Sequence, residues 1–142
     1  MKVKQLSVFL ENKAGRLREV TEVLSKHEIN IRSLYVAETS QFGIVRLIVE
    51  QTDKARDLLK MHDFTVEITD VIAVEVNDKP GNLSNVLNVL SSNGINLEYL
   101  YAFVERRQNK AVVIVKIEDI DRAEDVLKSN GIKILKQDEL YQ

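Results

Sequence analysis

The chain has 142 residues, which suits one ordinary domain or two small ones, and its formal net charge is −2. No basic stripe runs along it, so the electrostatic footprint of a nucleic-acid-binding protein is missing. There is no cysteine, which excludes disulfides, zinc–cysteine sites and thiol chemistry. Hydrophobic residues make up 44% and charged residues 30%, which is a globular rather than a disordered composition.

The N-terminal segment is basic but holds no sustained apolar stretch, and Glu11 follows it at once. We therefore expect no signal peptide. No apolar run approaches the length that spans a membrane, so we expect no membrane partner. Together with the missing cysteines, this favours a cytoplasmic protein.

The first half of the chain predicts six elements in order. Apolar residues alternate over 6–10, with the period of two that is typical of a strand, and recur with helical spacing over 17–24. Strands are predicted over 31–38 and 44–49, the second of which is rich in β-branched residues. A second helix is predicted to open at Asp53, a favourable N-cap residue, and a strand follows over 65–69.

The second half repeats this order. A shift of 66 residues places a strand over 72–76 and a helix over 83–90, followed by strands over 97–104 and 111–117. A helix is predicted to open at Asp121, and a last strand covers 133–137. Past Leu100 and Tyr101 in the second strand the shift becomes 68, so we expect two extra residues in the loop at 106–110.

The order βαββαβ thus occurs twice, which predicts an α+β fold of two ferredoxin-like units, 1–70 and 71–142. Each unit should be an antiparallel sheet with its helices on one face. Only Thr69-Asp70-Val71 joins the units, so we expect them to pack tightly, side by side. Asn93-Gly94 predicts a helix stop in the second unit, whereas His27-Glu28 must end the first unit's helix without glycine.

One turn is written twice, as E-N-K-A-G-R-L at 11–17 and as N-D-K-P-G-N-L at 77–83. Pro80 suits the first position of a helix, Asp78 could accept hydrogen bonds from first-turn amides, and Gly81 permits close approach to the backbone. One interpretation is a strand-to-helix turn with a cap. The other is a helix N-terminus whose open N–H groups receive a carboxylate. Both interpretations stay open at this point.

The motifs resemble the ACT domain, a small regulatory module that binds amino acids in many biosynthetic enzymes. The second unit carries the stronger match, with D-K-P-G-N-L at 78–83, then Val86, Val89 and Leu90, then G-I-N-L at 94–97. In the first unit Asn12 and Ala14 replace the aspartate and the proline, while the glycine and I-N-I at 29–31 are kept. The chain is similar to stand-alone tandem ACT proteins, which carry no catalytic domain.

The resemblance implies side-by-side pairing of the units, with small ligands at the seam. The first strand-to-helix loop of one unit and the start of the second strand of its neighbour would hold the ligand. Asn12 would then act with Asn96 at one site, and Asp78 with Asn30 at the other. The loop glycines that carry over are Gly15 and Gly81.

The resemblance also implies an amino-acid ligand without a cofactor or metal, a homodimer, and a regulated enzyme or other protein as partner. Because Ala14 and Asn12 depart from the family pattern, we expect the two sites to differ. Asparagines before a strand are also ordinary turn residues, so a purely structural role for Asn30 and Asn96 stays open.

A second interpretation is a structural module for oligomerisation or protein interaction, with no small ligand. Phe9 and Glu75 hold equivalent positions in the two first strands, so Phe9 would mark an apolar patch on the first unit only. An enzyme of the acylphosphatase type would need an arginine in the first loop, and only the first unit has Arg16 and Arg18 there.

Overall fold

The computed structural model describes residues 2–11, 13–38, 42–105 and 109–141. These divide into two compact units. The N-terminal unit is Lys4–Thr69 with Tyr141, and the C-terminal unit is Asp70–Leu140 with Lys2 and Val3.

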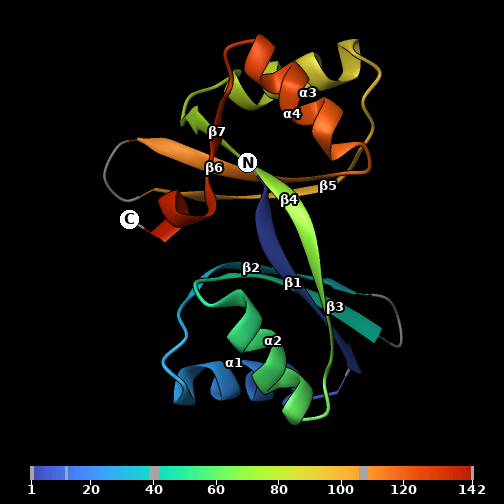
Figure 1. Ribbon diagram of the computed structural model, residues 1–142, viewed down its shortest axis with the longest axis vertical. Helices are drawn as coiled ribbons and strands as arrows, with labels where there is room; N and C mark the ends of the chain where they lie inside the picture. The colour runs from blue at the N-terminus through green and yellow to red at the C-terminus, as the bar shows by residue number, and fades with distance from the viewer. Residues whose placement is uncertain (1, 12, 39–41, 106–108, 142) are drawn as a thin grey trace. The chain divides into compact units, whose positions relative to one another are not determined.

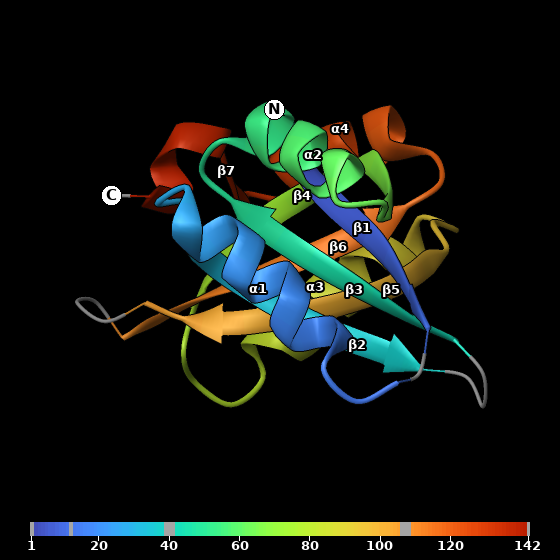
Figure 2. The ribbon, with the colours of Figure 1, turned by 90° about the horizontal axis from the view of Figure 1, so that it is seen from below.

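The N-terminal unit is built from four strands and two helices in the order βαββαβ. Its strand order is β2-β3-β1-β4, and β3 runs antiparallel to both β2 and β1. Figure 2 shows both helices on the same face of this sheet. The core between helices and sheet includes Leu6, Leu24, Leu47 and Leu59, all fully buried. The elements are β1 (Val3–Glu11), α1 (Arg16–Lys26), β2 (Ile31–Glu38), β3 (Phe42–Val49), α2 (Thr52–Met61) and the first part of β4 (Thr65–Asn77).

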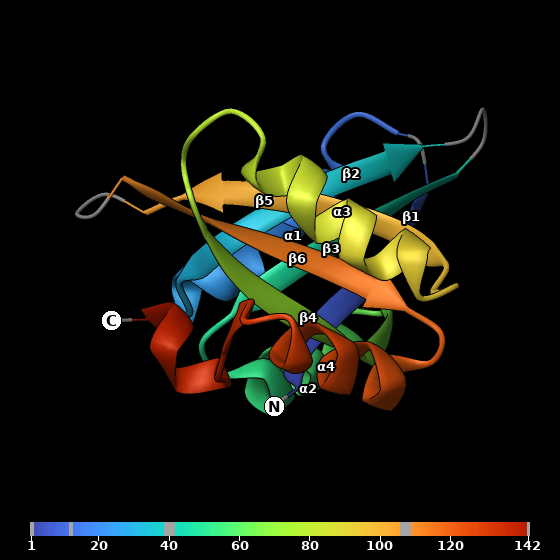
Figure 3. The ribbon, with the colours of Figure 1, turned by 90° about the horizontal axis from the view of Figure 1, so that it is seen from above.

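The C-terminal unit repeats this arrangement. In it β4 lies between β6 and β7, β5 lies outside β6, and all these pairs are antiparallel. Both helices lie on one face of the sheet (Figure 3). They cover a core that includes Ile72, Val86, Leu90 and Leu127. The elements after β4 are α3 (Asn82–Ser92), β5 (Leu97–Val104), β6 (Lys110–Ile117), α4 (Ile120–Ser129), β7 (Lys133–Leu135) and the 3-10 helix η1 (Gln137–Tyr141).

The predicted fold class is confirmed: each unit is a ferredoxin-like βαββαβ with an antiparallel sheet and its helices on one face (Figure 1). The position of the two extra residues is also confirmed. Three residues separate Glu38 from Phe42, and five separate Val104 from Lys110. Residues 106–108 of that loop lie outside the described residues.

Two predictions about strand ends were wrong. The strands predicted over 65–69 and 72–76 are one continuous strand, β4, because no glycine or proline interrupts the chain between them. The last strand ends at Leu135 instead of residue 137. There the Lys136 N–H donates to Glu139 Oε1 at 2.9 Å, and the Lys136 carbonyl accepts from the Glu139 N–H at 3.1 Å, which turns the chain into η1.

The predicted caps of the second helices were also wrong, each by two residues. The N-cap positions are Gln51 and Asp119 rather than Asp53 and Asp121. Asp119 accepts a hydrogen bond from the Arg122 N–H at 3.4 Å. Asp53 and Asp121 instead lie in the first helical turn, where the positive end of the helix dipole favours negative charge.

The helix exits follow the prediction that the first unit ends its helix without glycine. Gly94 lies in the left-handed region with φ 67°, and Glu28 takes the same conformation at φ 55°. In both exits an isoleucine N–H reaches back to a leucine carbonyl, from Ile29 to Leu24 at 2.9 Å and from Ile95 to Leu90 at 3.0 Å. Each exit is therefore a Schellman-type cap.

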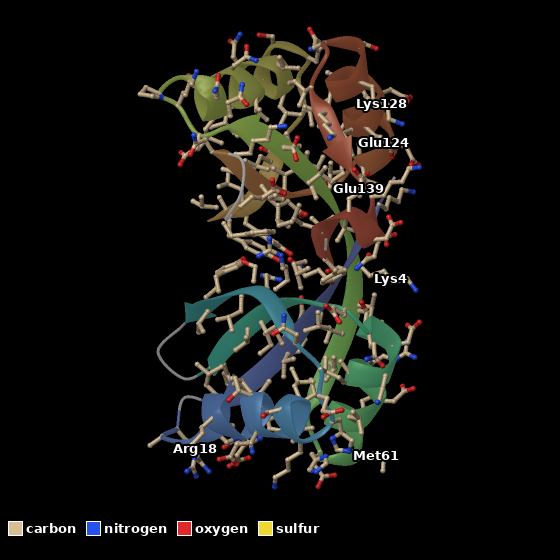
Figure 4. The ribbon with its side chains drawn as sticks, turned by 90° about the vertical axis from the view of Figure 1, so that its left-hand side faces the viewer. Lys4, Arg18, Met61, Glu124, Lys128 and Glu139 are labelled. Carbon is tan, nitrogen blue, oxygen red and sulfur yellow. The ribbon has the colours of Figure 1, made fainter. Side chains whose placement is uncertain are left out.

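The helices carry ion-paired side chains and, at the end of α2, an exposed apolar one. Figure 4 shows Glu124 and Lys128 side by side on α4, where they form an ion pair of 3.0 Å. Arg18 on α1 pairs with Glu22 at 3.7 Å, and Met61 at the end of α2 is 77% exposed. Within the described residues, no helix combines the length and the apolar character needed to cross a membrane.

Candidate functional site: the repeated strand-to-helix turns

The two repeated turns have the same backbone conformation. Gly15 and Gly81 are the N-cap residues of α1 and α3, with φ 88° and 91° and ψ −11° and −17°. A Cβ atom placed on either glycine would meet no atom within 4 Å. Each glycine is therefore required by its left-handed φ, and the space beside it is open.

Three backbone hydrogen bonds recur in both turns. Each turn has a tight bond across two residues, a longer bond into the N1 residue, and a first intrahelical bond to the N-cap glycine carbonyl. The distances in the two turns differ by at most 0.1 Å, so the doubled sequence produces a doubled structure. The bonds are Lys13 to Glu11 at 2.8 Å, Arg16 to Lys13 at 3.3 Å and Glu19 to Gly15 at 3.0 Å; and Lys79 to Asn77 at 2.9 Å, Asn82 to Lys79 at 3.3 Å and Asn85 to Gly81 at 2.9 Å.

Two expectations about the second turn were wrong. Pro80 is not the first residue of α3, because the helix begins at Asn82 after the N-cap Gly81. Asp78 does not cap the helix, since no side chain among the described residues accepts a hydrogen bond at this N-cap. The left-handed glycine makes the turn in place of a capping side chain. Asp78 is exposed, and its backbone N–H donates to the Asn109 carbonyl at 2.8 Å.

The two helix starts differ in charge. The first turn of α1 contains Glu19, which Arg16 contacts through Nη1 at 2.6 Å, whereas the first turn of α3 holds no acidic residue. Before α1, the Lys13 ammonium hydrogen-bonds to Glu11 and lowers the pKa of that carboxyl. The first turn of α3 therefore lacks a carboxylate that would repel an anion there.

The second-strand asparagines lie at the opposite end of each helix from the turn. Asn30 and Asn96 are both exposed and directly precede β2 and β5. Within one unit an 11-residue helix separates the turn glycine from the asparagine. That is about 16 Å at 1.5 Å per residue, so one small ligand cannot contact both within a unit. Asn12 lies outside the described residues.

A cavity of about 320 Å³ opens in the C-terminal unit beside the second turn. Its walls are Glu75, Val76 and Asn77 at the end of β4, the first turns of α3, Lys110 of β6, and residues 131–133, where β7 begins at Lys133. Glu75, Lys110 and Lys133 were not among the predicted site residues. Their contact depends on strand pairing, Lys110 with Asn77 and Lys133 with Glu75, which residue spacing does not reveal.

The two histidines do not form a metal site. Within the described residues, no three His, Cys, Asp or Glu side chains are grouped so that they could hold a metal ion. His27 and His62 are the C-cap residues of α1 and α2. Each places Nδ1 near the carbonyl oxygen four residues earlier, at 3.0 Å from Val23 and 2.9 Å from Leu58. Both therefore have a structural role at a helix end.

Comparison with known proteins gives a family and several related folds. The family model described as an ACT domain pair matches residues 1–142. The crystal structure of protein BT0572 from Bacteroides thetaiotaomicron is 45% identical, with a TM-score of 0.94, over 100% of this chain and 97% of that one. The comparison with curated proteins gave no significant match.

More distant structures share the fold. The ligand-free regulatory subunit of aspartate kinase from Thermus thermophilus has a TM-score of 0.62 at 14% identity, over 89% of this chain and 91% of that one. The regulatory subunit of aspartate kinase from Thermus flavus also has a TM-score of 0.62, at 13% identity, over 98% and 92%.

Proposed function

The chain belongs to the ACT domain pair family, and on that premise we propose that it is a non-catalytic regulatory protein that binds an amino acid or a similar small carboxylate. The observation that carries the proposal is the doubled turn. Two helices begin at a left-handed glycine with open space beside it, and no described side chain caps either of them. The N1 N–H of each helix donates to a turn carbonyl, and among the described residues the N–H groups of the next two positions remain for a carboxylate.

Two ligand sites are proposed, each made by both units. The turn with Asp78 and Gly81 would act with Asn30, and the turn with Asn12 and Gly15 would act with Asn96. Helix length supports this crossed pairing, because turn and asparagine of one unit lie at opposite ends of a helix. The ligand's carboxylate would bind first-turn amides, and Asp78 would accept from its ammonium.

The proposed mechanism is a ligand-stabilised arrangement of the two units. A ligand that bridges the units favours the packing geometry that it binds more tightly. The free energy of this shift equals the difference between its binding free energies for the alternative geometries. A homodimer and a regulated enzyme or other protein would respond to that geometry. Regulatory subunits of aspartate kinase, which share the fold, make an enzyme partner a reasonable expectation.

Thermal unfolding of the purified protein, measured with each of the twenty amino acids at millimolar concentration, tests the proposal. A ligand that binds only the folded state raises Tm by linkage. We expect a shift with one or two compounds, and loss of that shift in an Asp78→Ala, Asn30→Ala double variant. Asp125→Ala, an exposed aspartate on α4, is the matched control. An unchanged shift in the double variant would refute the site assignment.

A structural or interaction module is the second candidate, and one observation favours it. Phe9 is 40% exposed and Phe42 is 58% exposed. Phe9 pairs with Ile44, and Phe42 pairs with Glu11, so the two rings lie on one face of β1 and β3. The absence of any thermal shift, together with loss of self-association or of partner capture in Phe42→Ser, would favour this candidate over a ligand sensor.

A further inference from the structure

The cavity in the C-terminal unit exists because β7 is short. β7 pairs with β4 only at Ala73, Val74 and Glu75. Val76 and Asn77 therefore extend past the start of β7, and a notch remains between this edge of β4, the start of α3 and the segment before β7. Its volume of about 320 Å³ lies within the range of about 300–1,000 Å³ that small-molecule sites occupy.

Three charges of alternating sign line the notch. Glu75 Oε1 lies 3.2 Å from Lys110 Nζ and 3.4 Å from Lys133 Nζ. The Glu75 side chain is only 9% exposed, so the two lysines hold a nearly buried carboxylate in place. The side chains of Lys110 and Lys133 are 32% and 59% exposed, so each can contact a further anionic group. The cluster has a net charge of +1, in the order plus, minus, plus.

The other wall combines amides with aliphatic groups. Asn82 donates through Nδ2 to the Asn77 carbonyl at 2.8 Å, which fixes the amide at the edge of β4. Asn85 lies one turn further along α3. Val86 and Ile132 supply apolar surface. This wall suits a ligand with a short aliphatic chain between polar groups.

The N-terminal unit fills the equivalent space with its own side chains. Arg16 stands at the position of Asn82, and Phe64 at that of Ile132. The Arg16 guanidinium lies 4.5 Å from the centre of the Phe64 ring and pairs with Glu19 at 2.6 Å. This stacked pair is larger than Asn82 and Ile132, which stand at the equivalent positions of the C-terminal unit.

The charges are likewise specific to the C-terminal unit. Phe9, Phe42 and Thr65 hold the positions of Glu75, Lys110 and Lys133 in the N-terminal unit. The C-terminal unit therefore has the charge pattern beside its notch, and the N-terminal unit has larger side chains and none of these charges at the equivalent positions. If these side chains only stabilised the fold that both units share, the two units would not need different residues at these positions.

We propose that the notch binds an acidic amino acid, L-aspartate or L-glutamate. Such a ligand carries carboxylate, ammonium and carboxylate groups, a minus–plus–minus pattern that complements Lys110, Glu75 and Lys133. Its net charge of −1 offsets the +1 of the cluster. The site goes beyond the proposed function, since it lies within one unit and uses neither Asp78 nor Asn30.

Isothermal titration of the full chain with L-aspartate, L-glutamate, L-glutamine and succinate tests the charge pattern. We expect binding of L-aspartate or L-glutamate. Succinate lacks the ammonium and L-glutamine lacks one carboxylate, so each should bind about tenfold or more weakly, which is about 1.4 kcal/mol or more. Equal binding of all four probes, or no binding of the acidic amino acids at millimolar concentration, would overturn the proposal.

Filling the notch as the N-terminal unit fills its own space tests the location. Asn82→Arg with Ile132→Phe should abolish binding of the acidic amino acid, and Lys133→Met should weaken it about tenfold. Lys133 is exposed, so the second variant keeps the fold even if the first does not. Asp125→Ala, which changes an exposed aspartate that does not line the notch, should leave this binding unchanged. Binding retained in both Lys133→Met and the filled variant would overturn the notch assignment.

Discussion

Replacing Glu28 with glycine should stabilise the protein, although the change removes a whole side chain. Glu28 follows α1 at φ 55°, in the left-handed region where a residue with a Cβ atom is strained. Gly94 holds the equivalent position after α3 in the other unit. The Glu28 side chain is exposed and makes no hydrogen bond or ion pair among the described residues, so the change removes neither.

The size of the effect follows from two opposing contributions. The left-handed conformation costs a residue with a Cβ atom about 1–2 kcal/mol. Glycine loses about 0.5–1 kcal/mol more than other residues through its greater freedom in the unfolded chain. The net gain for Glu28→Gly should be about 0.5–1 kcal/mol. For a chain of this size, 1 kcal/mol shifts Tm by roughly 2–4 °C, so the expected rise in Tm is about 1–4 °C.

Urea unfolding followed by circular dichroism measures this free energy, and an unchanged m-value shows that the unfolded state is comparable. The mirror variant Gly94→Ala should lose about 1 kcal/mol. If Glu28→Gly is destabilising while Gly94→Ala is neutral, the left-handed exits are not under the strain that we infer from φ.

Further variants test three other parts of the structure in the same assay. Gly81→Ala should destabilise the fold by about 1–2 kcal/mol through backbone strain at φ 91° alone, because no atom lies near the added Cβ. Gly81→Asn should destabilise it less, and equal losses for the two variants would contradict the strain argument. Asp119→Ala should cost about 0.5–2 kcal/mol because it removes the N-cap side chain, and Asp121→Ala should cost less. A larger loss for Asp121→Ala would indicate that Asp121 is the N-cap, as the sequence predicted. Leu24→Ala in the N-terminal core should cost about 2–5 kcal/mol, and a cost below 1 kcal/mol would show that this core is not close-packed.

The element order could be read from the sequence because its signals are local. Alternation over 6–10 and helical spacing over 17–24 depend only on which face of one element is apolar. The repeat adds a second, independent copy of each signal. Even the two extra residues before β6 were visible, since an insertion shifts the spacing of everything after it.

The ends of elements were harder to predict, because several residues compete for each end. Asp119 and Asp121 are equally good cap residues by type, and only the course of the chain after β6 decides that Asp119 accepts from Arg122. Pro80 and Asp78 suited a helix start, but the left-handed Gly81 makes the turn instead.

The sequence by itself determined the family of the fold, the doubled turn and the positions where glycine or its substitutes must stand, because those depend on residues close together in the chain. Only the tertiary structure decided where space and charge meet. Glu75, Lys110 and Lys133 come from three strands, and their contact requires the pairing of β4 with both β6 and β7. Whether a cavity remains beside them depends on the volumes of side chains from two other segments, Asn82 and Ile132 in one unit and Arg16 and Phe64 in the other. Packing of this kind is a property of the folded chain, because it depends on how close side chains from separate elements come, which residue spacing does not encode.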